Sequence, residues 1–391
     1  MSGPALFCQP HRIRRGAALT LVFASVLVAG AATGNLPGAG GGTTAEGAPV
    51  AAPAGHGTDV ARAAEEAAAD GASPMEAAQR AVSRSGDRWA AVYSPGEYEE
   101  FEEALDGRYT GVGLWARERA GRIEVTRVGD GTPAADAGIR AGDRLRSVDG
   151  EKVDGRPVTE VVSLLRGGTT GASAGTTVRL GLERGTRVWS ETLRRVRLSR
   201  DTVTVSELAS RVTVVKVTAF TKGSGDEVRA AVRRAPAGAG IVLDLRGNSG
   251  GLVAEAVTAA SAFLDGGLVA TYDVEGEQRA LHAEPGGDTT RPLVTLVDGG
   301  TMSAAELLTG ALQDRGRAVV VGSRTFGKGS VQMPTPLPDG SVAELTVGHY
   351  RTPSGRGVDG HGITPDLEAD AEALQRAETV LSGLGRRPAV G

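Results

Sequence analysis

From Val203 to about Ala371, short apolar runs alternate with segments that have the composition of helices. The run at 239–247 (AGIVLDLRG) is too continuously apolar for a strand with one face in water, which indicates a strand buried on both faces. Strands that alternate with helices fold as helices packed on a sheet, so this region predicts an α/β layered domain with a sheet of mixed strand direction. The chemistry of such a domain is expected on its loops.

The composition limits the number of domains and the classes of function. A chain of 391 residues is long enough for two or three domains. Its net charge of −4 provides no basic surface, so nucleic acid is not an expected partner. Cys8 is the only cysteine, and the five histidines show no H-x-x-x-H spacing. The sequence therefore predicts no intrachain disulfide, no metal centre and no cofactor.

The N-terminus has the pattern of an export signal. Basic residues at 11–15 precede an apolar stretch at 16–32, and Ala29 and Ala31 form an A-x-A cleavage pattern. Residues 1–32 are therefore predicted to be a signal peptide or membrane anchor, which places the rest of the chain outside the cytoplasm, secreted or anchored at the cell envelope. Residues 33–58, rich in glycine, alanine and threonine, are predicted to be a flexible linker. A membrane tether and an oligomeric state both stay open.

Two further regions precede the α/β domain. Residues 59–107 are acidic and helix-prone, and Pro95 begins a short helix. From Tyr109 the pattern changes to short strands and turns. The run GVGLWA is strand-like, and helices are expected at Pro133–Ala137 and in the amphipathic segment 158–167. The run GTPAADAGIRAGDRL resembles PDZ domains of the bacterial type, which predicts a PDZ domain at 108–199.

The resemblance to PDZ domains implies a peptide-binding loop. In such domains backbone N–H groups of one loop hold the terminal carboxylate of a peptide, which adds as a strand to the domain's edge. The substrate-binding residues implied here are Thr110, Gly111, Val112, Gly113 and Leu114. The alternative is that Gly111 and Gly113 are ordinary hairpin glycines.

Two loops of the α/β region carry candidate catalytic groups. The first, DLRGNSGG at 244–251, follows a buried strand, and its glycines free backbone amides to face a ligand oxygen. The second, DGGTMSAAE at 298–306, also joins a strand to a helix. Ser303 and Glu306 have the spacing of a capping box, so one interpretation of Ser303 is that it only caps the helix.

Three runs together resemble the carboxyl-terminal processing peptidases, also called tail-specific proteases: LDLRGNSGG, the segment from Val297 to Gln332, and YRTPSGRGVDGHGITPD. The likeness covers nearly all of the chain after the linker. It implies a fold class of α/β and α+β, in which a β-rich PDZ domain is inserted before a ClpP/crotonase-like α/β layered peptidase core at 200–391. It also implies protein or peptide substrates with accessible, apolar C-termini.

The resemblance assigns catalytic roles by position. Ser303 corresponds to the nucleophile, Lys328 to the general base and Gln332 to the residue that orients the lysine. The oxyanion hole corresponds to the amide of Ala304 with an amide of Gly250 or Gly251. The chain departs from the family at Met302, where a small residue is common, and at Ala305, where a serine is common.

The chemistry of a lysine base explains the run TFGKGSVQ. A lysine takes a proton from serine only when it is neutral, and its ordinary pKa near 10.4 must be lowered by burial. Gly327 and Gly329 allow backbone to pack closely around Lys328, and Gln332 can hydrogen-bond to a neutral amine without adding charge. Together with the resemblance, these residues predict an exported Ser–Lys endopeptidase that recognises protein C-terminal tails.

Other interpretations of these residues are also consistent with the sequence. Lys328 is also consistent with a surface lysine in a turn. A Ser-His-Asp triad is the weaker enzyme interpretation, because no G-x-S-x-G motif accompanies His282, His349 or His361. Asp314 is interpreted as a structural helix-end carboxylate. The contrasting function is an inactive PDZ peptide-binding scaffold of the same fold.

Overall fold

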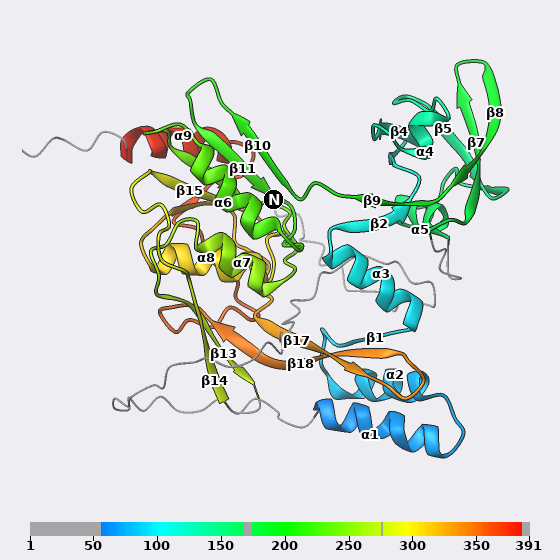
Figure 1. Ribbon diagram of the computed structural model, residues 1–391, viewed down its shortest axis with the longest axis horizontal. Coiled ribbons are helices and arrows are strands. Elements are labelled where there is room, and N and C mark those ends of the chain that lie inside the picture. Colours follow the sequence, from blue (N-terminus) through cyan, green and yellow to red (C-terminus); the bar gives the residue numbers. More distant parts are fainter. Residues whose placement is uncertain (1–55, 168–173, 275–276, 385–391) are drawn as a thin grey trace, which may run out of the picture. The chain divides into compact units, whose positions relative to one another are not determined.

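The computed structural model describes residues 56–167, 174–274 and 277–384, and Figure 1 shows their helices and strands. These residues form two compact units, one of Thr110–Leu198 and one of residues 56–109 and 199–384. The predicted leader (1–32) and most of the predicted linker (33–58) lie outside the described residues. Helix α1 begins at His56, inside the predicted linker. In the described part of the chain, no helix has both the length and the apolar character that crossing a bilayer requires.

The unit of Thr110–Leu198 is built on one antiparallel sheet. Its strand order is β3-β4-β5-β7-β8, and β6 pairs with β5. The elements in chain order are β3 (Leu114–Arg119), β4 (Arg122–Val128), α4 (Pro133–Asp136), β5 (Arg144–Val148), β6 (Glu151–Lys152), α5 (Val158–Arg166), β7 (Thr177–Arg184) and β8 (Arg187–Arg194). Alternate strand residues such as Ile123 and Leu145 form the core together with Val161 of α5. Strand β3 lies at the end of this order, so among the described strands only β4 pairs with it.

The strand expected in GVGLWA is interrupted. Strand β2 (Arg108–Gly111) ends before Val112 and pairs with β9 (Val196–Ser199), whereas β3 begins at Leu114. Gly113 separates the two strands with a φ of 82°, and a Cβ there would lie 2.3 Å from the Cβ of Thr132. The chain turns at Gly113 because this residue packs directly on the start of α4.

The second unit contains a six-stranded sheet of mixed direction, as predicted. Strands β10 and β11 are antiparallel, and the remaining neighbours are parallel. The order along the sheet is β10 (Val203–Glu207), β11 (Thr213–Val217), β12 (Ile241–Asp244), β15 (Leu293–Val297), β16 (Val319–Gly322) and β19 (Leu367–Glu368).

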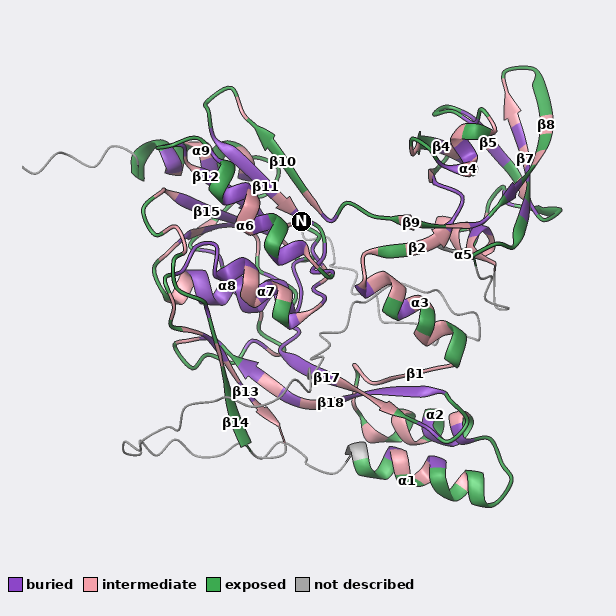
Figure 2. Ribbon diagram, viewed as in Figure 1, coloured by how far each residue is buried: buried purple, intermediate pink, exposed green. Residues whose placement is uncertain are grey.

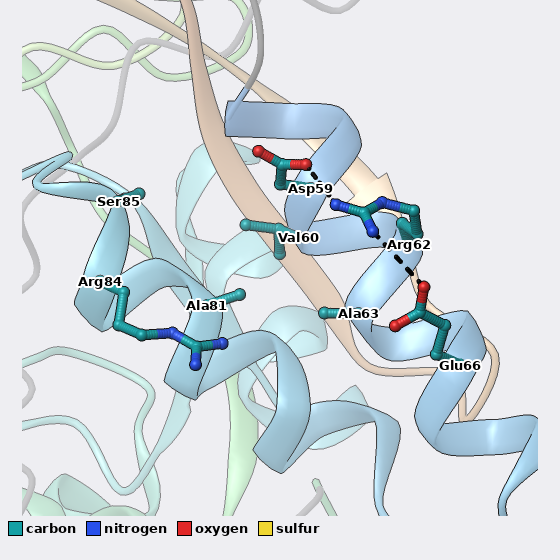
Figure 3. A pocket seen from close by; sticks show the side chains of 8 residues that line it. All are labelled: Asp59, Val60, Arg62, Ala63, Glu66, Ala81, Arg84 and Ser85. Atoms are coloured by element: carbon teal, nitrogen blue, oxygen red, sulfur yellow. Dashed lines mark hydrogen bonds and ion pairs between the residues drawn. The ribbon is translucent and has the colours of Figure 1, made fainter.

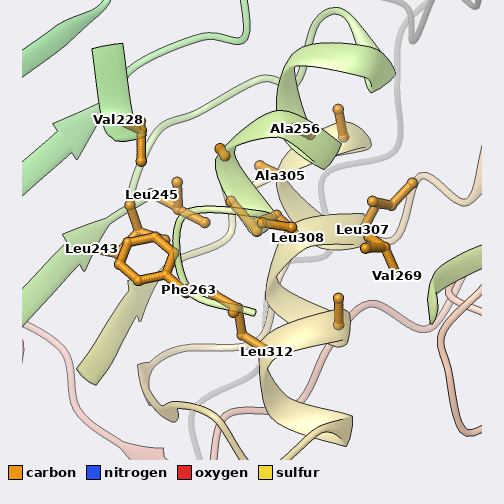
Figure 4. Close-up of a cluster of buried hydrophobic side chains, with 14 of the residues drawn as sticks. Val228, Leu243, Leu245, Ala256, Phe263, Val269, Ala305, Leu307, Leu308 and Leu312 are labelled. Carbon is orange, nitrogen blue, oxygen red and sulfur yellow. The ribbon is translucent and has the colours of Figure 1, made fainter. Parts of the chain in front are cut away.

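Helices cover both faces of this sheet, which explains why β12 is buried at every position (Figure 2). One face packs against α6 (Ser224–Arg234), α7 (Val253–Ala260) and α8 (Ala304–Asp314), and Figure 4 shows Leu243 of β12 in that core with Leu308 of α8. Val242 belongs to the other core, which contains α9 (Ala373–Leu384). Helix α7 ends at Ala260, and the N–H groups of Ala262 and Phe263 bond to carbonyls three residues back rather than four.

A second sheet of this unit was not predicted. Its order is β1 (Ala91–Tyr93), β18 (Val342–Arg351), β13 (Leu268–Val274) and β14 (Glu277–His282), and β17 (Ser330–Pro336) also pairs with β18. Helices α1 (His56–Ala69) and α2 (Pro74–Ser85) pack on β18, and α3 (Pro95–Leu105) follows β1. The helical N-terminal region therefore shares a sheet with strands from the end of the chain.

Candidate active site

Three loops meet at one edge of the six-stranded sheet. They follow β12, β15 and β16, which are adjacent parallel strands, so their carboxyl ends lie at the same edge. In open α/β sheets this edge is the usual place for a binding site. Each loop contains one predicted part of the site: the glycine loop, Ser303 and Lys328.

The glycine loop is joined to the serine loop by buried hydrogen bonds. The Asn248 side chain donates to the Val217 carbonyl (3.0 Å) and accepts from the Gly250 N–H (2.8 Å). The Asn248 carbonyl accepts from the Met302 N–H (2.8 Å). A Cβ on Gly250 would lie 2.9 Å from the Cβ of Ser303. Only glycine lets these two loops approach so closely.

Ser303 has an unusual backbone conformation. It occupies the N-cap position of α8 with φ 59° and ψ −118°, a region that a residue with a Cβ avoids, and its side chain is 0 % exposed. The Tyr350 hydroxyl donates to the Ser303 carbonyl (3.0 Å). Backbone strain of this kind costs roughly 1–3 kcal/mol and is concentrated at functional sites. A residue that only caps a helix has ordinary extended backbone, so a cap role does not account for this conformation.

Glu306 is buried and connects the serine and lysine loops. Its Oε2 accepts from the N–H groups of both Ser303 (2.9 Å) and Lys328 (2.8 Å). Its Oε1 accepts from the Thr325 hydroxyl (2.5 Å) and the Gly327 N–H (2.7 Å). Burial raises the pKa of Glu306, and these four hydrogen bonds oppose the rise. The sequence predicts Glu306 only as the capping partner of Ser303. Its bonds to the lysine loop are not predicted, because they come from residues far along the chain.

Lys328 is buried, with 1 % of its surface exposed. A Cβ on Gly327 would lie 3.0 Å from the Gly362 nitrogen, and one on Gly329 would lie 2.5 Å from the Asp359 nitrogen, so backbone packs against both glycines. Burial lowers the pKa of Lys328 to about 8, against the opposing charges of nearby carboxylates. A surface lysine in a turn is therefore excluded, and a substantial fraction of the amine is neutral near pH 8.

In this conformation Gln332 has another hydrogen-bond partner than Lys328, the residue that it is expected to orient. The Gln332 side-chain nitrogen donates to the Trp89 carbonyl (2.5 Å), and its buried Oε1 has no hydrogen-bond partner among the described residues. The ammonium nitrogen of Lys328 lies 5.0 Å from the centre of the Trp89 ring. Trp89, which the sequence analysis did not single out, therefore contacts both the lysine and the glutamine. Nothing in local sequence indicates this contact, since Trp89 and Gln332 are 243 positions apart.

The predicted peptide loop, Thr110 to Leu114, belongs to the other unit. Its centre is held against α4: the Val112 carbonyl accepts from Ala134 N–H (3.0 Å), and the Gly113 carbonyl accepts from Gly129 N–H (2.9 Å). The loop leads directly into β3, the edge strand of its sheet.

The other candidate residues lie outside the three loops that follow β12, β15 and β16. Asp314 accepts from the N–H (2.9 Å) and hydroxyl (2.6 Å) of Ser354 and pairs with Arg356, as expected of a structural carboxylate at a helix end. His349 lies in β18 and His361 in a loop.

A pocket of about 430 Å³ lies between α1 and α2. Figure 3 shows the side chains that line it, among which Arg62 pairs with Asp59. None of the predicted site residues lines that pocket.

Comparisons with known proteins match parts of both units. The profile of "Peptidase family S41" matches residues 211–369, and the profile of "PDZ domain" matches residues 124–180. A carboxyl-terminal-processing peptidase from the chloroplast of Arabidopsis thaliana is 36 % identical over 308 residues, which cover 73 % of this chain and 58 % of the relative. A carboxy-terminal-processing protease of Bartonella bacilliformis is 33 % identical over 281 residues, which cover 68 % of this chain and 63 % of the relative.

A solved structure gives the same result. A photosystem II D1 C-terminal processing protease superposes with a TM-score of 0.51 and 29 % identity, covering 80 % of this chain and 86 % of that one. The chain spans about three fifths of the length of the curated relatives named above (58 % and 63 %).

Proposed function

Because the chain belongs to peptidase family S41, in which its relatives are carboxyl-terminal processing proteases, we propose that it is a serine endopeptidase with a Ser303–Lys328 dyad. The neutral Lys328 amine takes the proton of the Ser303 hydroxyl while the serine oxygen attacks the scissile carbonyl. Lys328 then gives this proton to the leaving amine. Water hydrolyses the resulting acyl-enzyme in the same way, with Lys328 again accepting and returning a proton.

One observation carries this proposal more than any other. Glu306 Oε2 accepts from the N–H groups of Ser303 and Lys328 together, so the two residues cannot move independently. The strained backbone of Ser303 and the lowered pKa of Lys328 are the two properties that a serine nucleophile and a lysine base require. Both side chains are buried, so a substrate reaches them only after covering residues move.

For the oxyanion hole we favour Ala304 with Gly251. Ala304 is the first residue of α8, where a helix leaves its N–H groups without intrahelical partners. The Gly250 N–H already donates to Asn248, so Gly251 has the more available amide of the two glycines. Both glycines have positive φ (98° and 130°), which lets the loop turn amides toward one point.

The same proposal includes recognition of protein C-terminal tails. The loop at 110–114 would hold the tail's carboxylate with backbone N–H groups, and the tail would pair with β3 at the sheet edge. Export through the segment at 1–32, with cleavage or retention as an anchor, completes the proposal. The substrates are then proteins outside the cytoplasm with accessible, apolar C-termini.

Substitution of the dyad tests the chemistry. Ser303→Ala should abolish cleavage of a denatured protein substrate. Lys328→Arg keeps the positive charge but cannot act as a base, since a guanidinium does not deprotonate in proteins. The Arg variant should therefore be as inactive as Lys328→Ala, with both variants shown to be folded by circular dichroism. Turnover by folded Ser303→Ala would reject the nucleophile, and an inactive wild-type protein that still binds peptides would support the scaffold alternative.

Amidation of a substrate's C-terminus tests tail recognition. It removes the negative charge that the loop amides would hold and leaves the scissile bond unchanged. The amidated peptide should be cut more slowly than the same peptide with a free carboxylate. Equal rates would show that chain ends are not recognised.

A further inference from the structure

Several unpaired polar atoms lie on the segments that carry or flank the proposed base. In the described part of the chain, the buried side-chain atoms that have no hydrogen-bond partner include Trp89 Nε1, Ser330 Oγ, Gln332 Oε1 and both carboxylate oxygens of Glu344. Each unpaired buried group costs about 1–3 kcal/mol, so folded proteins keep few of them, and their concentration in one place needs an explanation.

Strand pairing places Glu344 in this corner. In the β17–β18 hairpin Gln332 is opposite Thr346 and Pro334 is opposite Glu344, so the Gln332 and Glu344 side chains share one face as diagonal neighbours. On its other edge, β18 pairs Glu344 with Ala91, two residues after Trp89.

Trp89 and one charge interaction connect this face with the lysine. The Lys328 ammonium lies 5.0 Å from the Trp89 ring, the Gln332 amide donates to the Trp89 carbonyl, and Glu344 and Lys328 interact through their charges. The amine, the amide and the carboxylate therefore occupy one buried corner.

Glu344 is a buried carboxylate, and the charge of Lys328 offsets part of the cost of burying its negative charge. It is 1 % exposed and has no hydrogen bond, so burial raises its pKa to about 7, and the charge of Lys328 opposes this rise. The effect is mutual. Burial lowers the pKa of Lys328 to about 8, and the charge of Glu344 opposes this decrease more strongly than any other carboxylate does. Each group favours the charged form of the other.

The titratable groups whose charges act on this pair come from four segments, and Arg88 and His349 lie beside one of them, Asp359. Tyr93 of β1 and Tyr98 of α3 face Glu344, and burial raises the pKa of each to about 12, so both stay neutral in the working range. Asp87, before β1, and Asp359, in the loop that packs on Gly329, act on Lys328. Asp87 accepts hydrogen bonds from the backbone and hydroxyl of Thr346, and Asp359 accepts one from Gly329 N–H. Glu344 differs from both because its oxygens have no other partner.

We propose that Glu344 is a positioning residue for the base: its unpaired carboxylate retains the proton on Lys328 and so sets the acid side of the pH range in which the dyad works. This rests on the proposed role of Lys328. It assigns a function to a buried charge that the mechanism itself does not use. The family roles of Ser303, Lys328 and Gln332 do not include it.

Glu344→Gln is a sharp test because it keeps the shape and removes only the charge. Lys328 should then lose its proton at lower pH, so the acid limb of the rate profile moves to lower pH while the plateau rate is kept. Each unit of movement corresponds to up to about tenfold more neutral amine, and hence up to about tenfold more turnover. The gain should appear between about pH 7, the pKa of Glu344, and the wild-type midpoint, and should fade at lower pH, where Glu344 is protonated in the wild-type protein. Glu344→Asp keeps the charge and should leave the limb near its wild-type position. Glu277→Gln, on an exposed side chain of β14, is the matched control and should leave the profile unchanged.

A direct measurement separates this inference from the proposed function. The chain has four lysines, so spectra of lysine labelled with ¹³C and ¹⁵N are simple, and Lys328→Met assigns the signal. In the Ser303→Ala background, the pKa of Lys328 should fall when Glu344 becomes Gln. Conversely, the pKa of the Glu344 carboxyl should rise when Lys328 becomes Met, since the coupling is reciprocal. This second measurement does not need the Glu344→Gln variant to fold.

The outcomes lead to different conclusions. If neither the Lys328 pKa nor the Glu344 pKa responds to loss of its partner, the proposal is overturned, whatever the rates do. If the Lys328 pKa falls but the acid limb does not move, Lys328 is not the base, and the proposed function fails instead. If Glu344→Gln and Glu344→Asp lose stability alike and leave both the pKa and the limb in place, Glu344 has only a structural role.

Discussion

The buried ammonium of Lys328 should make the folded protein less stable than it would be without the amine. Lys328→Met keeps most of the aliphatic side chain and removes the charge. The Lys328 pKa is lowered from 10.5 to about 8, and a difference of this size corresponds to about 3 kcal/mol at about 1.4 kcal/mol per unit. Loss of the lysine also removes the counter-charge of Glu344, but that carboxyl can take up a proton, because burial raises its pKa to about 7. We therefore expect a gain of about 1–3 kcal/mol in the free energy of unfolding at pH 7.

The gain should depend on pH in one direction. Because its pKa is lower in the folded state, Lys328 destabilises the fold fully below about pH 8 and progressively less as the pH rises toward 10.5. The stability difference between Lys328→Met and its parent should therefore be largest at pH 7 and small near pH 10.

Urea unfolding in a Ser303→Ala background measures this without self-cleavage. Trp115→Phe and Trp189→Phe leave Trp89 as the only tryptophan, so fluorescence reports on the unit that contains Lys328. Lys222→Met removes an exposed lysine and serves as the control, with an expected change within about 0.5 kcal/mol. Equal or lower stability of Lys328→Met at pH 7, or a gain that is the same at pH 10, would refute the reasoning.

Substitutions at three residues test further features of the structure. Ser303→Gly should remove the strain of a positive φ and stabilise the fold by about 1 kcal/mol while abolishing turnover, and a loss of stability in urea would contradict the strain argument. Glu306→Gln keeps one acceptor oxygen for the N–H groups of Ser303 and Lys328, so we expect a cost of about 1–3 kcal/mol with turnover largely retained. Glu306→Ala removes every acceptor and should lower kcat by at least about 100-fold in protein that is still folded, whereas equal kcat for the two variants would show that Glu306 does not hold the dyad. Gly113→Ala places a Cβ against Thr132, so it should reduce the rate difference between free and amidated tails, and an unchanged difference would exclude the loop from tail recognition.

The sequence predicted the parts of the site that depend on local pattern. The strand–helix alternation indicated the sheet of mixed strand direction, and the glycines around Lys328 indicated a buried amine, which the structure confirms at 1 % exposure. The capping-box spacing identified Glu306 as a partner of Ser303, and that hydrogen bond is present. These inferences succeeded because the relevant residues are a few positions apart.

The remaining features depend on pairing between distant segments. Gln332 bonds to Trp89 rather than to Lys328 because β1 and β17 flank the same strand, β18. Burial of Glu344 has the same origin, since an isolated glutamate in the run SVAELTV is ordinarily an exposed residue of a half-buried strand. No local pattern in the sequence indicates which distant strand covers it.

The pairing of β1 with β18 also determines how much of the chain must be made before the corner around Lys328 can form. Asp87 and Thr346, which bond to each other, are 259 positions apart. At about 5–20 residues per second, a ribosome needs roughly 13–50 s to make the intervening chain. Over that time β1, which follows Trp89, has no β18 to pair with. Residues 110–198, which lie between the two strands in the sequence, are already complete. The corner around Lys328 is therefore completed only when nearly the whole chain has been made, so the proposed dyad cannot form in an unfinished chain.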